Sequence, residues 1–100
     1  MEKPAEPRGG LDGLYQVLQK NITYPVDARR KGIMGKVFVS FIIERDGTLA
    51  DVRVVKGIGY GCDEEAVRVI KITSPWKPAM QNGKPVRSRF VIPLEFKLKR

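Results

Sequence analysis

The residues whose types and spacing most suggest a binding or catalytic site lie between Gly57 and Glu65, where three glycines are followed by three acidic side chains. A strand, a glycine-rich turn and a helix in this order are typical of a nucleotide-binding loop. The spacing does not match, because Gly57-x-Gly59-x-Gly61 places the third glycine one residue too early for the dinucleotide fingerprint. Asp63-Glu64-Glu65 also occupies the helix N-terminus where a phosphate would bind. We therefore predict a structural loop and no nucleotide site.

Residues for other kinds of catalysis or for metal binding are scarce. The chain has no histidine, which removes the commonest general base and metal ligand. Its single cysteine, Cys62, cannot form an intrachain disulfide and argues against a zinc site. We predict that Cys62 is a small buried hydrophobe on a helix. The sequence predicts no enzyme activity, no metal site and no cofactor.

The net charge of +8 arises from 19 basic and 11 acidic residues, and it leaves several partners open. From Lys84 to Arg100 there are six basic residues and one acidic residue. Such an excess fits a solubilising surface, nucleic acid, anionic lipid or an acidic peptide. Phe38 and Phe41 are three residues apart, so on a strand they point to opposite faces and make a poor base-stacking platform. We therefore expect no nucleic-acid partner.

The order of elements is typical of one small α+β domain. No apolar run approaches the ~18–20 residues that span a bilayer, and no signal-peptide pattern opens the chain. The composition of residues 1–10 predicts a linker that forms no packed element. One folded domain is expected to follow over residues 11–100. The expected elements are a helix from Leu11 to Ile22, a short helical segment from Pro25 to Lys31, strands Lys36–Glu44 and Leu49–Lys56, a helix from Asp63 that ends at Ser74-Pro75, and a last strand.

The last strand, Val86 to Leu98, carries a proline within an alternating apolar pattern. Phe90, Ile92, Leu94, Phe96 and Leu98 share one parity, whereas Arg87, Arg89, Glu95 and Lys97 share the other. Pro93 has no N–H, so a strand that contains it belongs at a sheet edge. We predict a two-layer α+β sandwich, with strand order 2-1-3 and helices on one face. An exposed edge is a template for pairing with an added strand, which indicates peptide binding.

Several motifs together resemble the C-terminal domain of a TonB energy transducer, over about residues 11–98. They are Tyr24-Pro25, Ala28, Gly32-Ile33-x-Gly35-x-Val37-x-Val39-x-Phe41-x-Ile43, Asp46-Gly47, Val52, Val54-Val55-Lys56, Asp63-Glu64-Glu65-Ala66, Trp76-Lys77-Pro78-Ala79, Asn82-Gly83-Lys84-Pro85-Val86 and Ile92-Pro93-Leu94-x-Phe96. The segment Glu2-Lys3-Pro4-Ala5-Glu6-Pro7 resembles the end of a Pro-rich periplasmic spacer.

The resemblance implies a periplasmic domain anchored in the inner membrane by a segment outside this sequence. Such a domain binds the TonB box, an extended peptide of outer-membrane transporters, by strand addition, and an ExbB–ExbD-type complex drives it through the membrane anchor. The partner-binding residues implied are Tyr24, Pro25, Val86, Arg87, Arg89, Val91, Pro93 and Glu95. The basic side chains Arg87, Arg89 and Lys97 are expected to favour acidic residues in the peptide.

Three alternatives stay open at this level, of which a basic nucleic-acid-binding module is the most distant. Similar domains end other envelope proteins, such as sensor-like peptidases, so the same binding mode could serve a different parent protein. The exposed strand could also pair with a second copy of itself and form a homodimer.

Overall fold

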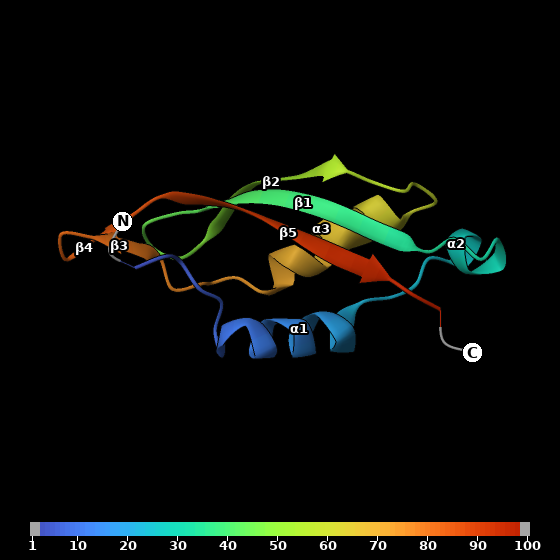
Figure 1. Ribbon diagram of the computed structural model, residues 1–100, viewed down its shortest axis with the longest axis horizontal. Helices are drawn as coiled ribbons and strands as arrows, with labels where there is room; N and C mark the ends of the chain where they lie inside the picture. The colour runs from blue at the N-terminus through green and yellow to red at the C-terminus, as the bar shows by residue number, and fades with distance from the viewer. Residues whose placement is uncertain (1–2, 99–100) are drawn as a thin grey trace.

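Alternating apolar residues build a three-stranded sheet in the computed structural model, which describes residues 3–98 (Figure 1). The sheet order is β2-β1-β5, and both β2 and β5 pair antiparallel with β1. The elements are α1 (Gly10–Asn21), α2 (Val26–Arg30), β1 (Gly35–Ile43), β2 (Leu49–Lys56), α3 (Cys62–Ile72), β3 (Ala79–Gln81), β4 (Lys84–Val86) and β5 (Ser88–Phe96). The predicted fold class and the strand order 2-1-3 are confirmed.

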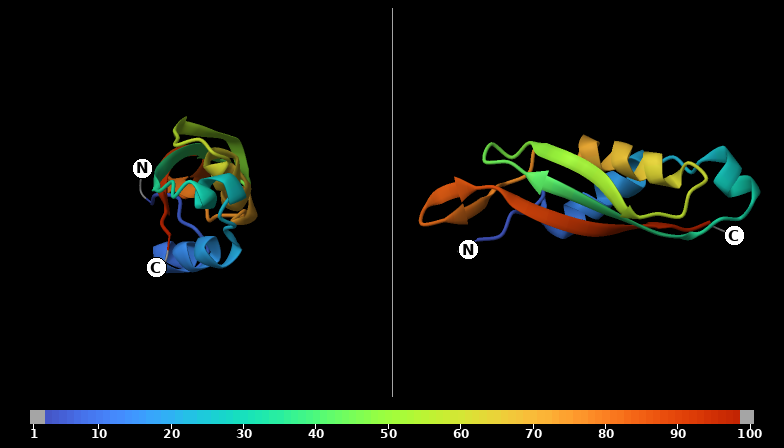
Figure 2. Two further views of the ribbon diagram at one scale, coloured as in Figure 1. Left: turned by 90° about the vertical axis from the view of Figure 1, so that its right-hand side faces the viewer. Right: turned by 90° about the horizontal axis from the view of Figure 1, so that it is seen from above.

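The core lies between one face of the sheet and the helices, as the views along and across the long axis show (Figure 2). Every second residue of β1 from Val37 to Ile43 is completely buried, and β5 contributes Ile92, Leu94 and Phe96. The helices supply Leu14 and Leu18 of α1 and a buried stripe on α3 that includes Cys62. The predicted parity of the last strand and the burial of Cys62 are therefore confirmed.

The two outer strands of the sheet differ in regularity. β5 keeps a continuous register with β1 over nine residue pairs, from Gly35↔Phe96 to Ile43↔Ser88. β2 shifts register against β1 twice, and Asp51 at one of these irregularities has a positive φ of 51°. Bulges of this kind twist a strand and interrupt its ladder. Of these two strands, only β5 therefore presents a long, regular outer margin, by which we mean the edge of Ser88–Phe96 that faces away from β1.

The β1–β2 turn is joined to the core by a tryptophan. Gly47 has a φ of 89°, and its carbonyl accepts a hydrogen bond of 2.8 Å from the Trp76 backbone N–H. The Trp76 ring packs edge-on against Phe41 and Phe90, at centroid distances of 5.2 and 5.5 Å. Its Nε1–H donates to Thr73 Oγ1 at 2.9 Å. This ring therefore connects the turn, the end of α3 and two strands.

The predicted single strand from Val86 to Leu98 is wrong at its start. Lys84–Val86 forms β4 of a separate two-stranded hairpin with β3, and Arg87 separates it from β5. The positive φ values of Asn82 (53°) and Gly83 (73°) suit the tight turn of that hairpin. Because Val86 pairs with Ala79, it lies outside the outer margin of β5.

Residues 3–10, the described part of the predicted linker, differ from the expectation of no packed element, whereas residues 1 and 2 lie outside the described residues. Lys3 and Glu6 form antiparallel bridges to Met80 and Lys77, with four backbone hydrogen bonds of 2.8–3.2 Å. Ala5 between them is only 3% exposed. A proline-containing segment can pair in this way because only some of its N–H groups are needed for the ladder.

Candidate functional site

The outer margin of β5 is the candidate functional site, because among the described residues β5 pairs with β1 alone. Arg89, Val91 and Glu95 are exposed and Pro93 is half-buried. Val91 has 53% of its surface exposed, although it is a large apolar side chain in the middle of a strand.

The direction of the backbone groups on β5 follows from the hairpin that precedes it. The Glu44 N–H donates to Thr48 O across the β1–β2 turn, so it faces β2. Backbone direction alternates along a strand, so Phe38, six residues earlier, also directs its N–H and C=O toward β2. Pro93 is opposite Phe38. Pro93 therefore lies in a pair without hydrogen bonds, and its nitrogen faces outward, as the sequence predicted.

The same alternation fixes which groups are free for an added strand. Arg89, Val91 and Glu95 share the parity of Pro93 and direct their N–H and C=O groups outward. Proline interrupts this row by one missing donor only. Residues of the other parity, such as Ile92, bond to β1.

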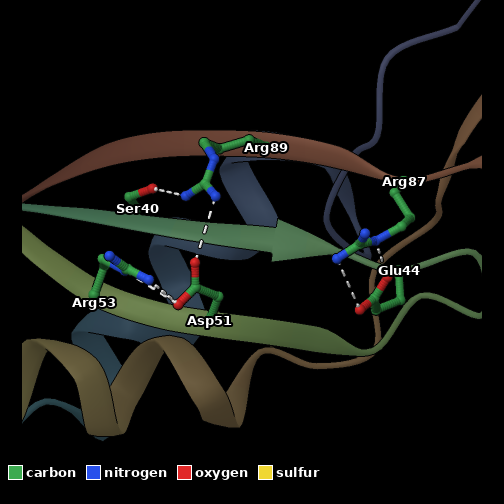
Figure 3. A network of polar contacts seen from close by, with 6 residues as sticks. All are labelled: Ser40, Glu44, Asp51, Arg53, Arg87 and Arg89. Atoms are coloured by element: carbon green, nitrogen blue, oxygen red, sulfur yellow. Dashed lines mark hydrogen bonds and ion pairs between the residues drawn. The ribbon is translucent and has the colours of Figure 1, made fainter.

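Arg89 forms part of a polar network on the sheet face opposite the helices (Figure 3). Its Nη1 donates to Ser40 Oγ at 2.8 Å, and its Nη2 lies 3.4 Å from Asp51 Oδ2. Asp51 also accepts from Arg53, whose Nη2 is 2.5 Å from Oδ1. These hydrogen bonds, that to Arg53 foremost, hold the pKa of Asp51 below its usual value. The network connects β2 to β5 across β1.

Arg87 is likewise engaged within the chain, with its Nε 2.6 Å from Glu44 Oε1 (Figure 3). The expectation that Arg87 and Arg89 simply attract acidic peptide residues therefore needs correction, because each already has a carboxylate partner. Lys97 is exposed and has no carboxylate within 4 Å in residues 3–98. It is the predicted basic residue that stays available.

Tyr24 and Pro25, the two implied binding residues outside the last strand, occupy different surroundings. The Tyr24 ring packs edge-on against Phe96 at 5.7 Å, so it lies at the C-terminal end of β5. Its hydroxyl donates to the Ile33 carbonyl, and burial raises the pKa of this phenol. Pro25 precedes α2 and lies against Gly61. Of these two residues, Tyr24 is the one with a ring contact to β5.

An ion pair on α3 holds the segment that leads into Tyr24. Glu65 Oε2 accepts from the Thr23 N–H at 2.6 Å and from Arg68 Nη2 at 2.6 Å. Arg68 Nη2 also donates to the Asn21 carbonyl at 2.7 Å. The hydrogen bond from Arg68 is the main reason that the pKa of Glu65 is lowered, and that from Thr23 adds to it.

We expect Glu65→Gln to lower the free energy of unfolding by about 1.5 kcal/mol near neutral pH, because it removes the charge from a carboxylate that accepts hydrogen bonds from Thr23 and Arg68. A depressed carboxyl pKa stabilises the fold above the ordinary value of 4.5 and loses that effect as the pH falls through the lowered pKa. The difference between wild type and variant should therefore shrink below pH 4.5. Urea unfolding followed by circular dichroism at about pH 7 and about pH 3 measures it.

Glu64→Gln is the matched control, because Glu64 is exposed on the same helical turn. Both substitutions remove one charge near the helix N-terminus, so that contribution cancels in the comparison. Equal losses in the two variants at all pH values contradict a specific role for Glu65.

A groove beside β5 was missed by the sequence reasoning. It has a volume of about 1170 Å³ and lies between α1 and the end of β5. Tyr15 is 43% exposed and lines this groove. The available signal was the stripe Tyr15, Gln19 and Ile22, which lies beside the buried Leu14 and Leu18 at helical spacing.

The glycine-rich loop before α3 is closed by its own acidic residue. Asp63 Oδ1 accepts from the N–H groups of Ile58 and Gly59 at 2.9 and 3.2 Å. These are the donors that a phosphate would need. The arrangement favours the structural loop over a nucleotide site. Within residues 3–98, no three His, Cys, Asp or Glu side chains are grouped closely enough to hold a metal ion.

Comparison with known proteins assigns the chain to a family. The family model for the C-terminal domain of Gram-negative bacterial TonB proteins matches residues 20–98. The chain belongs to this family. Two solution structures of the Helicobacter pylori TonB C-terminal domain are similar to this TonB C-terminal domain. The one of residues 179–285 is 30% identical with a TM-score of 0.68, and the match covers 90% of this chain and 81% of that chain.

The second solution structure, of residues 194–285, is 28% identical with a TM-score of 0.71, and the match covers 90% of this chain and 95% of that chain. No curated protein sequence matches the chain. The molecule is thus a domain of the TonB energy-transducer type. No helix in residues 3–98 is long and apolar enough to cross a membrane.

Proposed function

We propose that this domain captures an extended peptide by strand addition to the outer margin of β5 and has no catalytic role. The observation that carries the proposal is the continuous register of β5 with β1 beside an outward row of backbone groups. Strand addition needs such a row, because main-chain hydrogen bonds provide the affinity.

β5 is a better template than the other outer strand, β2. The two register shifts of β2 and the positive φ of Asp51 prevent a regular row of donors and acceptors. β5 has no register shift over its nine pairs with β1. Its single defect is the donor that Pro93 lacks.

The family supplies the partner for this binding mode. We propose that the peptide is the TonB box of an outer-membrane transporter and that the domain works in the periplasm. It would be joined through a segment outside this sequence to the inner membrane and to an ExbB–ExbD-type complex. The same margin could serve a TonB-like domain of another envelope protein, since the peptide contacts would be main-chain contacts in either case.

The expected affinity is micromolar. An added strand that forms about five hydrogen bonds gains roughly 0.5–1.5 kcal/mol from each, less the entropy of ordering the peptide. A dissociation constant near 1 µM corresponds to about −8 kcal/mol. Such binding is reversible, which suits a domain that engages and releases transporters.

Titration of the isotope-labelled domain with a transporter N-terminal peptide tests the proposal by NMR. We expect the largest amide shifts within Ser88–Phe96, with the outward-facing N–H groups of Arg89, Val91 and Glu95 newly protected from exchange. Shifts confined to β2, or scattered over the surface, would count against it.

Sedimentation at several concentrations without peptide tests the alternative of self-pairing. A dimer that forms through β5 should dissociate on peptide addition, because both need the same backbone groups. A dimer that persists at saturating peptide does not use this margin.

A further inference from the structure

The groove between α1 and the end of β5 continues the outer margin of β5. One wall is the stripe Tyr15, Gln19 and Ile22 on α1, and the other includes Leu94 and Leu98. Met34, which is 51% exposed, lines it where the chain approaches β1. In Figure 1, α1 runs below β5, and α3 passes behind β1 and β5.

A strand added to β5 would direct every second side chain toward this groove. Leu94 is 4% exposed and faces the helices, whereas its neighbours Pro93 and Glu95 face the other side of the sheet. Side chains directly opposite one another on paired strands point to the same face. The peptide residue opposite Leu94 therefore points toward α1.

We propose that this groove is a side-chain subsite that selects a large aliphatic or aromatic residue at that peptide position. The proposal rests on the proposed strand addition and specifies which peptides the margin accepts. Backbone pairing alone carries no sequence preference, so specificity must come from pockets for alternate side chains.

The lining of the groove determines the chemistry of the occupant. Tyr15 and Met34 are half-exposed and offer apolar surface. A hydrophobic side chain that covers this surface removes it from water and so stabilises the complex. Lys36, Lys97 and Glu95 are also among the residues that line the groove, and two of these three are basic. The excess positive charge disfavours a cationic side chain there.

Synthetic peptides of alternating threonine and valine provide the probe, with the residue opposite Leu94 set to leucine, alanine or lysine. We expect the leucine peptide to bind roughly tenfold more tightly than the alanine peptide, because an open groove buries only part of the apolar surface of the three added carbons. The lysine peptide should bind more weakly than the alanine peptide. Calorimetry measures the affinities, and NMR shifts on β5 verify the binding mode.

The variant Tyr15→Ser should reduce the preference for leucine over alanine, measured as the ratio of the two affinities, to about twofold or less. Leu11→Ser is the matched control, because Leu11 is 59% exposed on the same helix and does not line the groove. It should keep the full preference. Circular dichroism confirms that both variants fold.

The outcomes separate this proposal from the one on which it rests. If no peptide shifts β5 amides, strand addition itself fails. If all three peptides shift β5 equally and bind with equal affinity, strand addition stands and the subsite is refuted. A peptide-free dimer that Tyr15→Ser dissociates would assign the groove to a second copy of the chain and also overturn the proposal.

Discussion

Val91→Pro is expected to weaken peptide capture at least about tenfold while the domain stays folded. Val91 is opposite Ser40 in a pair without hydrogen bonds, so its N–H faces outward. Proline removes that donor and places its ring carbons where the added strand would approach. A hydrogen bond lost with its partner left unsatisfied costs about 1–3 kcal/mol, or roughly tenfold in affinity. Calorimetry with the transporter peptide measures the loss.

Ile92→Pro is the control that tests the direction of the backbone. Ile92 is opposite Val39 and bonds to β1, and its side chain is only 7% exposed. Proline there removes a ladder hydrogen bond and a core side chain, so we expect a loss of about 3 kcal/mol or more of stability. If instead Val91→Pro unfolds the domain and Ile92→Pro does not, the assignment of the outward row is wrong.

Trp76→Ala is expected to lower the free energy of unfolding by about 3–5 kcal/mol. The side chain is 3% exposed and contacts Phe41 and Phe90. Its loss leaves a cavity between the β1–β2 turn and the sheet, and Thr73 Oγ1 loses its Nε1–H donor. Thermal unfolding followed by far-ultraviolet circular dichroism measures the change, because the variant has no tryptophan fluorescence.

Two further variants keep the test of Trp76 informative if the alanine variant does not fold. Trp76→Phe retains most of the ring contact and should lose about 1–2 kcal/mol. Leu11→Ala, at a position that is 59% exposed, should change stability by less than about 0.5 kcal/mol. A melting temperature of Trp76→Ala close to that of wild type contradicts the central role of this ring.

Local rules allowed much of the fold to be predicted from the sequence. Period-two alternation identified β1, β2 and the buried face of β5, because side-chain direction in a strand depends only on parity. The dipeptides Asp46-Gly47 and Asn82-Gly83 are typical turn residues and lie at the two hairpin turns, where Gly47, Asn82 and Gly83 have positive φ values. Pro93 placed β5 at an edge, because a missing N–H excludes a strand from the interior of a sheet.

The candidate site was predictable only in part. The outward row on β5 follows from Pro93 and alternation, both of which are local. The carboxylate partners of Arg87 and Arg89 come from residues 43 and 38 positions away, and no local pattern connects them. The groove was equally hidden, because its walls come from α1 and β5 at opposite ends of the chain.

By itself, the sequence determined which strand has a margin fit for pairing and which of its faces is buried. These properties are consequences of residue type and parity along one segment. Only the tertiary structure decided that Arg87 and Arg89 are already paired, that residues 3–6 pair with residues 77–80, and that Tyr15 lines a groove. Such contacts depend on how elements distant in the sequence pack together, and local propensity carries no information about that packing.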